Sequence, residues 1–174
     1  MTSTEKEYTV VKITGNREKK EFESVALPNS LIEIGNFAFY NCECLKEIKI
    51  PNSVKSIGDW AFKGCTSLQT VIIPDSVKSI GFETFEDCSS LQTVNIPNSV
   101  KSIGDWAFYR CSSLQTIKIP NSVESIGNGA FKNCSRLKTV IIPNSVKSIG
   151  GWAFEGCSNL QTIDIPDSVE SIKI

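Results

Sequence analysis

Residues 68–88 of the 174-residue chain are LQTVIIPDSVKSIGFETFEDC, and this stretch decides the fold because it returns with few changes along most of the sequence. Its first part places β-branched residues at Val71, Ile72 and Ile73, a composition that is typical of a short strand. Pro74 has no N–H to donate to a ladder, so we expect the strand to end there. Gly81 then closes a turn, since glycine readily adopts a positive φ.

The second part of this stretch is predicted to be helical. Ile80, Thr84, Phe85 and Cys88 follow helical spacing, which indicates one or two turns of α- or 3₁₀-helix. The chain then returns to Leu91, where the next unit begins.

The sequence repeats with a period of 23 residues, which all seven prolines and one glycine, phenylalanine, cysteine and leucine per unit follow. A single unit cannot bury its own apolar face, whereas stacked units bury a continuous one. We therefore expect an α/β repeat protein that forms a right-handed solenoid. One parallel β-sheet, with strands about 4.8 Å apart, should line the inner, concave face, with short helical segments on the outer arc. The prolines are Pro28, Pro51, Pro74, Pro97, Pro120, Pro143 and Pro166.

The units share the pattern Leu-x-x-Ile-x-Ile-Pro-x-Ser-Val-x-x-Ile-Gly-x-x-Ala-Phe-x-x-Cys-x-x-Leu, as in residues 45–65 and 114–134. This pattern resembles the BspA-like (Treponema pallidum-type) class of leucine-rich repeat over roughly residues 22–172. Thr84 in place of the alanine and Lys173 in place of a glycine are small departures. The resemblance implies a large bacterial or protist protein, secreted or displayed at the cell surface, that adheres to host or microbial surface proteins. It implies no catalytic residue, because the motif is structural.

The repeat array is expected to span residues 22–174 as about six and a half units, with a capping strand or hairpin in residues 1–21. Alternating apolar residues in 7–14, followed by a Gly-Asn turn signal, predict a strand that covers the first coil. The last unit stops halfway through a coil, without a polar cap. We interpret the chain as part of a longer protein. The alternative is self-association, in which another copy covers the open C-terminal coil.

Composition excludes several classes of protein. An apolar fraction of 40% with a net charge of −1 indicates a folded chain without the basic character of a nucleic-acid partner. No run of about 18 apolar residues predicts membrane insertion, and residues 1–10 show no secretory signal. Histidine is absent, and no Gly-rich phosphate loop or nucleophile elbow accompanies the many serines. The sequence therefore predicts no metal, no cofactor and no enzymatic activity.

The seven cysteines invite a disulfide or metal interpretation. Six of them recur in one ladder, where the Cβ atoms of neighbours should point the same way and not at each other. We therefore predict buried thiols that fill a core position. Cys44 lies off the ladder and is predicted to be exposed.

Two rows of residues are expected on the exposed face of the sheet. One row is nearly constant, while the other changes chemistry at each step although the rest of the unit is copied closely. Such variation on a fixed scaffold is how repeat proteins present a binding surface, but drift at an exposed position gives the same pattern. The near-constant row is Glu47, Thr70, Thr93, Thr116, Thr139 and Thr162. The variable row is Lys49, Ile72, Asn95, Lys118, Ile141 and Asp164.

Three tryptophans occupy one phase of the coil in alternate units, at Trp60, Trp106 and Trp152. They could form an aromatic stripe for a partner or a glycan, but packing against the neighbouring coil is the favoured interpretation. A second variable set on the same arc is interpreted as a solvated face. It comprises Tyr40, Lys63, Glu86, Tyr109, Lys132 and Glu155.

The sequence thus favours a non-enzymatic protein-recognition or adhesion module that binds a partner protein through the concave sheet face. One alternative is an intracellular, cytoplasmic scaffold, favoured by cysteines without a disulfide-like pattern. The other is an architectural spacer with no ligand of its own.

Overall fold

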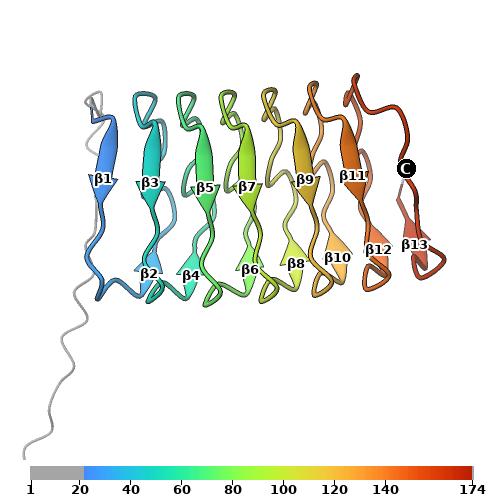
Figure 1. The fold of residues 1–174 in the computed structure, drawn as a ribbon, viewed down its shortest axis with the longest axis horizontal. Coiled ribbons are helices and arrows are strands. Elements are labelled where there is room, and N and C mark those ends of the chain that lie inside the picture. Colours follow the sequence, from blue (N-terminus) through green and yellow to red (C-terminus); the bar gives the residue numbers. More distant parts are fainter. Residues whose placement is uncertain (1–21, 174) are drawn as a thin grey trace, which may run out of the picture.

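Each 23-residue unit forms one coil, and the coils stack side by side along the long axis of the molecule (Figure 1). This computed structural model describes residues 22–173. The predicted capping strand at residues 7–14 lies outside that range. The handedness of the solenoid and the curvature expected of its sheet stay predictions.

The first strand of each coil lies where the β-branched residues predict it, and it ends before the proline. Neighbouring strands are parallel and shifted by one period, so that Lys49 pairs with Ile72, and Ile72 with Asn95. An isolated parallel bridge between Ile141 and Asp164 carries the row into the last coil. The strands of this row are β1 (Ser24–Ala26), β3 (Glu47–Lys49), β5 (Thr70–Ile72), β7 (Thr93–Asn95), β9 (Thr116–Lys118) and β11 (Thr139–Ile141). They are hydrogen-bonded as two sheets, β1-β3-β5-β7 and β9-β11, so the single sheet that the sequence predicts is divided between β7 and β9.

A second row of strands follows the proline turn, where the sequence interpretation placed only a turn (Figure 1). Each strand is a Ser-Ile or Glu-Ile pair whose isoleucine points inward in all but the last strand. Two residues are too few to show strand periodicity, so only pairing with the next coil identifies them as strands. They are β2 (Glu33–Ile34), β4 (Ser56–Ile57), β6 (Ser79–Ile80), β8 (Ser102–Ile103), β10 (Ser125–Ile126), β12 (Ser148–Ile149) and β13 (Ser171–Ile172).

The outer arc contains no helix among the described residues, so the predicted helical segments were wrong. A series of turns replaces them, and its N–H groups bond alternately to the next coil and within the coil. The N–H of Phe62 donates to the Thr84 carbonyl oxygen at 2.9 Å, and that of Lys63 donates to the Trp60 carbonyl oxygen at 3.2 Å. Trp60 and Gly64 have left-handed φ values of 55° and 74°. Two left-handed residues per arc are incompatible with a right-handed helix, and they leave every second N–H for the neighbouring coil.

The repeated glycine before the arc serves close packing. Gly81 does not have the expected positive φ, since the positive-φ glycines of the described chain are Gly64, Gly129 and Gly156. A Cβ atom on Gly104 would lie 2.6 Å from the Gly81 carbonyl oxygen in the neighbouring coil. The distance between coils at this position therefore excludes any side chain.

A stack of phenylalanine rings runs through the core. The ring centroids of Phe62 and Phe85 are 5.3 Å apart, as are those of Phe85 and Phe108, and the rings are nearly parallel. Leucine, valine, isoleucine and cysteine residues of successive coils surround this stack in rows of their own. Each coil buries its apolar residues against identical residues of its neighbours, which a single coil cannot do.

The cysteine ladder is buried, as the sequence predicts. All seven cysteines lie within the described residues, and none forms a disulfide. The Sγ of Cys88 donates to the Phe62 carbonyl oxygen of the preceding coil at 3.1 Å, and the same bond recurs along the ladder. Burial raises the pKa of the Cys88 and Cys134 thiols well above the ordinary range. Cys44 is exposed, which confirms the prediction.

The phenylalanine stack predicts a large loss of stability for Phe85→Ala. Phe85 is fully buried between two other rings, so its truncation should lower the free energy of unfolding by about 3–5 kcal/mol. Ile72→Ala, at an exposed position of the same coil, should change it by about 0.5 kcal/mol or less. Chemical denaturation of both variants measures the difference, and equal effects would contradict the burial of Phe85 within the ring stack.

The cysteine ladder predicts selective labelling. A thiol reagent should modify Cys44 in the folded chain, because the ladder thiols are buried and stay protonated. The denatured chain should release all seven thiols, and Cys44→Ser should abolish the fast reaction of the folded form. Fewer than seven thiols after denaturation would indicate disulfides and contradict the assignment of the cysteines as free thiols.

Candidate functional site

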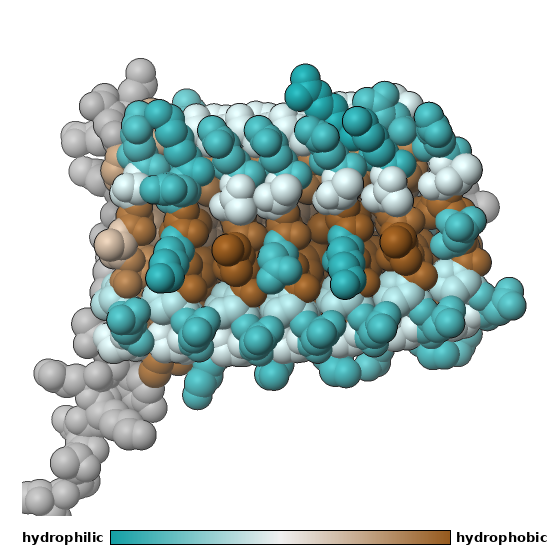
Figure 2. Space-filling view, in the orientation of Figure 1, coloured by the Kyte–Doolittle hydropathy of each residue, from teal (hydrophilic) through white to brown (hydrophobic). Residues whose placement is uncertain are grey.

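The outward side chains of β3, β5, β7, β9 and β11, with those of the following coil, form one surface, which we call the strand face. All six residues of the variable row, and all six of the threonine row beside it, are exposed on this face, where the sequence analysis placed them. The variable row runs from Lys49 to Asp164, and we call it the central row. Paired strands join Lys49, Ile72 and Asn95, and pairing joins Lys118, Ile141 and Asp164, whereas β7 and β9 lie in separate sheets. Figure 2 shows it as hydrophilic side chains interrupted by apolar ones.

Ile72 and Ile141 are the apolar members of the central row, with 62% and 68% of their surface exposed. Ile72 lies between Lys49 and Asn95 on the adjacent strands, and Ile141 lies beside Lys118. Large apolar side chains held this far out on a rigid sheet are available to contact a partner. The register of the strands fixes which polar groups stand next to them.

The central row repeats every three coils, which the sequence analysis missed although the signal is present in the sequence. Its order is Lys, Ile, Asn in one half and Lys, Ile, Asp in the other, so that Lys118 and Ile141 repeat Lys49 and Ile72. The variable set on the arc has the same three-coil period: Tyr40, Lys63, Glu86, then Tyr109, Lys132, Glu155. The period becomes apparent only when each row is followed separately along the stack.

The threonine row borders the central row on one side. The Oγ1 atoms of Thr70 and Thr93 are 3.3 Å apart, within hydrogen-bonding distance across the two strands. The hydroxyl groups are exposed, so they can also bond to water or to a partner. A depression at the N-terminal end of the same face is lined by residues that include Ser24, Lys49 and Ile72.

The three tryptophans lie on the arc, and neighbouring coils cover two of them in part. Trp60 stacks on Phe37 of the preceding coil, with ring centroids 4.7 Å apart. Trp106 covers Gly129 of the following coil, where a Cβ atom would lie 2.5 Å from the indole Cε3. Trp152 is 54% exposed. Packing thus accounts for Trp60 and Trp106, whereas Trp152 offers an open aromatic surface.

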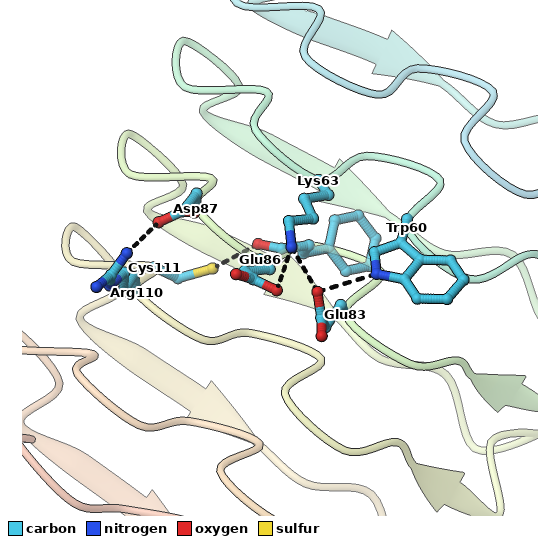
Figure 3. A network of polar contacts seen from close by, with 8 residues as sticks. Trp60, Lys63, Glu83, Glu86, Asp87, Arg110 and Cys111 are labelled. Atoms are coloured by element: carbon cyan, nitrogen blue, oxygen red, sulfur yellow. Dashed lines mark hydrogen bonds and ion pairs between the residues drawn. The ribbon is translucent and has the colours of Figure 1, made fainter.

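A cluster of charged groups occupies the arc next to Trp60 (Figure 3). The Lys63 Nζ lies 2.5 Å from Glu83 Oε2 and 3.0 Å from Glu86 Oε2, and the indole N–H of Trp60 donates to Glu83 at 2.9 Å. Glu86 is 8% exposed and is the one buried charged residue among those described. The interpretation of this set as a solvated face was therefore wrong for Glu86, because Lys63 and Glu83 surround it.

The carboxyl groups of this cluster have opposite pKa shifts. Burial and the hydrogen bond with Glu83 raise the pKa of Glu86 to about 7, although Lys63 acts in the other direction. Burial also acts to raise the pKa of Glu83, but hydrogen bonds from Glu86, Lys63 and Trp60 outweigh it and place the pKa below its ordinary value. Glu83 therefore carries the negative charge that faces Lys63, while Glu86 retains a proton up to near-neutral pH. The hydrogen bonds and ion pairs of these groups lie within the cluster, so the arrangement stabilises the fold and offers no open binding site.

The described residues contain no group of three or more histidine, cysteine, aspartate or glutamate side chains arranged to hold a metal ion. Within the same part of the chain, no helix is long and apolar enough to span a bilayer. The strand face combines exposed apolar and charged groups in a fixed array.

The model of the BspA type leucine-rich repeat region matches residues 17–134 and 101–174, with six copies of the repeat. The chain belongs to the BspA-type leucine-rich repeat family. This confirms the resemblance carried by the glycine, Ala-Phe and cysteine positions of the repeat. No curated protein matches the chain.

Solved structures of leucine-rich repeat proteins share this fold. The leucine-rich repeat protein of T. pallidum is 39% identical over 80% of this chain and 68% of its own, with a TM-score of 0.78. A leucine-rich cell surface protein from Faecalibacterium prausnitzii A2-165 is 42% identical over 80% of this chain, with a TM-score of 0.74. A leucine-rich repeat protein from Eubacterium ventriosum is 29% identical over 87% of this chain, with a TM-score of 0.79. The chain spans 38% and 41% of the length of the latter two proteins.

The charged cluster predicts a pH-dependent contribution to stability. Glu86 has a raised pKa in the folded state, so its proton stabilises the fold below the ordinary glutamate pKa of 4.5, and this contribution is lost as pH rises through about 7. The free energy of unfolding, measured by denaturation from about pH 5 to about pH 8, should therefore fall less steeply for Glu86→Gln than for the native chain. Glu155→Gln, the exposed equivalent three coils later, is the control and should keep the native slope. An unchanged slope for Glu86→Gln would contradict the assignment.

Proposed function

We propose that this BspA-type repeat chain is a non-enzymatic protein-interaction module that binds its partner through the strand face, in the manner of an adhesin. The exposure of Ile72 and Ile141 at fixed positions between charged and polar side chains carries the proposal. An apolar anchor with polar groups around it is the usual composition of a protein-binding surface. The sheet holds these groups rigidly, so binding would require little ordering of the surface.

Display at the cell surface or secretion is part of the same proposal. The relative from F. prausnitzii is described as a cell surface protein, and its sequence is 42% identical over the shared region.

An intracellular scaffold is the second candidate. Seven cysteines without a disulfide favour it, because proteins in oxidising compartments commonly pair exposed thiols and reducing compartments keep them reduced. The ladder thiols are buried and would survive in either compartment, so Cys44 is the residue that bears on the choice.

The double variant Ile72→Lys/Ile141→Lys tests the strand face. Lysine at these exposed positions leaves the core intact, which circular dichroism can verify, while it removes both apolar anchors. We expect the native chain to capture a protein from extracts of host or neighbouring cells and the variant to lose at least about tenfold in affinity, or about 1.4 kcal/mol. Ile32→Lys is the matched control, since Ile32 is exposed away from the central row and lysine is the natural residue there at Lys55, Lys78 and Lys101.

Each outcome discriminates between candidates. Equal capture by the native chain and the double variant would remove the strand face from the proposal and point to Trp152. If neither the native chain nor any variant captures a protein, the result would favour an architectural spacer.

A further inference from the structure

The order of residues in the central row is complementary to itself when it is reversed. Read from β3 to the last coil, the row is Lys, Ile, Asn, Lys, Ile, Asp, and its reverse is Asp, Ile, Lys, Asn, Ile, Lys. Laid against each other, the two orders place every lysine opposite aspartate or asparagine and every isoleucine opposite isoleucine. The matched positions are Lys49 with Asp164, Ile72 with Ile141, and Asn95 with Lys118.

We propose that the strand face binds the strand face of a second copy of this chain, with the two solenoids antiparallel. The inference rests on the proposed function, because it names the partner of the same face. A two-fold axis parallel to the strands, passing between Asn95 and Lys118, produces all six contacts. The interface is isologous, so each matched pair occurs twice.

Charge selects the antiparallel arrangement over the other two-fold arrangement. If two copies packed face to face with their solenoid axes parallel, every residue of the row would meet itself. Lys49 and Lys118 would each face a lysine, and Asp164 would face an aspartate. Like charges placed directly opposite each other oppose association, whereas the antiparallel arrangement joins opposite charges.

Charge and apolar contact also select the register. Sliding one antiparallel copy by a single coil places Lys49 against Ile141, and sliding it by two coils places Lys49 against Lys118. A shift of three coils restores the match, because the row has a three-coil period, but it leaves half of the coils without a partner. The register that matches all six residues from Lys49 to Asp164 therefore has the most matched contacts, and it leaves Ala26, the exposed β1 residue that pairs with Lys49, beyond the contact.

The neighbouring row is compatible with this arrangement. The rotation leaves the strand direction unchanged, so the threonine row of one copy faces the threonine row of the other. Thr70 then faces Thr139, and Thr93 faces Thr116, all four being exposed hydroxyl groups that both donate and accept hydrogen bonds. Glu47, the one charged member of that row, faces Thr162, so no like charges meet.

The size of the face predicts a weak, reversible dimer. Six coils about 4.8 Å apart and strands of three residues give a contact about 24 Å long and about 10 Å wide. The resulting area of about 240 Å² per partner is smaller than the area of about 800 Å² per partner that stable complexes bury. The avidity of such a weak association increases when several chains are held together on one surface, because their effective concentration is higher.

Charge reversal tests the contact between Lys49 and Asp164. In the intact chain, Lys49→Asp or Asp164→Lys should each weaken dimerisation, measured by sedimentation equilibrium, by about five- to thirtyfold, since two contacts per dimer become repulsive. The double variant Lys49→Asp/Asp164→Lys should restore the native affinity. A double variant as weak as the single ones would overturn the proposal, as would a native chain that stays monomeric up to about 1 mM.

Cross-linking tests the orientation directly. In a Cys44→Ser background, a mixture of Ile72→Cys and Ile141→Cys chains should form a disulfide between the two kinds of chain. Ile72→Cys alone should not cross-link, because its two copies would lie three coils, or about 14 Å, apart. Cross-linking of Ile72→Cys with itself would indicate either the parallel arrangement or the antiparallel register shifted by three coils, and both would overturn the proposed pairing of Ile72 with Ile141. A monomeric chain that still captures another protein through Ile72 and Ile141 would overturn the second-copy partner and leave the proposed function intact.

Discussion

The hydrogen bonds between residues one period apart are the constraint on which the rest of the structure depends. They join most neighbouring strands of both rows, and the alternate N–H groups of the arc, in a single register; the pairs β7 and β9, and β4 and β6, lie in separate sheets. Because the register is the same on all three sides of the coil, every side chain lies above the side chain of the same position in the next unit. A change of register at one side would misplace the other two.

This register turns each position of the repeat into a row along the stack. Positions that point inward become continuous rows of phenylalanine, leucine and cysteine, whose contacts allow little variation. Positions that point outward become rows in which each unit can carry a different residue without disturbing the core. The central row is such a position, and its three-coil period gives the face a chemical pattern longer than the coil itself. Recognition through this face would therefore depend on several coils at once.

The arc shows how one substitution is accommodated within the same constraint. Glu83 stands where other units carry an aromatic residue or glycine, and it occupies the left-handed conformation of that position, with a φ of 49°. Its carboxylate accepts hydrogen bonds from Trp60 and Lys63 of the preceding coil. The negative charge of Glu83 is thereby paired at an arc position where other units place an aromatic ring or glycine. Glu86 is buried beside it.

The sequence by itself determined the period, the position of the first strand, its end at the proline, the buried cysteine ladder and the rows exposed on the strand face. These follow from spacing and residue type, since a strict repeat leaves one way to stack the units. The sequence did not determine the conformation of the arc or the second strand. The spacing of residues around Thr84 and Phe85 is compatible with a helix. The arc instead forms turns, because its N–H groups find hydrogen-bond partners in the next coil. Partners 23 residues away are invisible to local periodicity, and for the same reason only the tertiary structure decided that Glu86 is buried and that Trp106 requires Gly129 beside it.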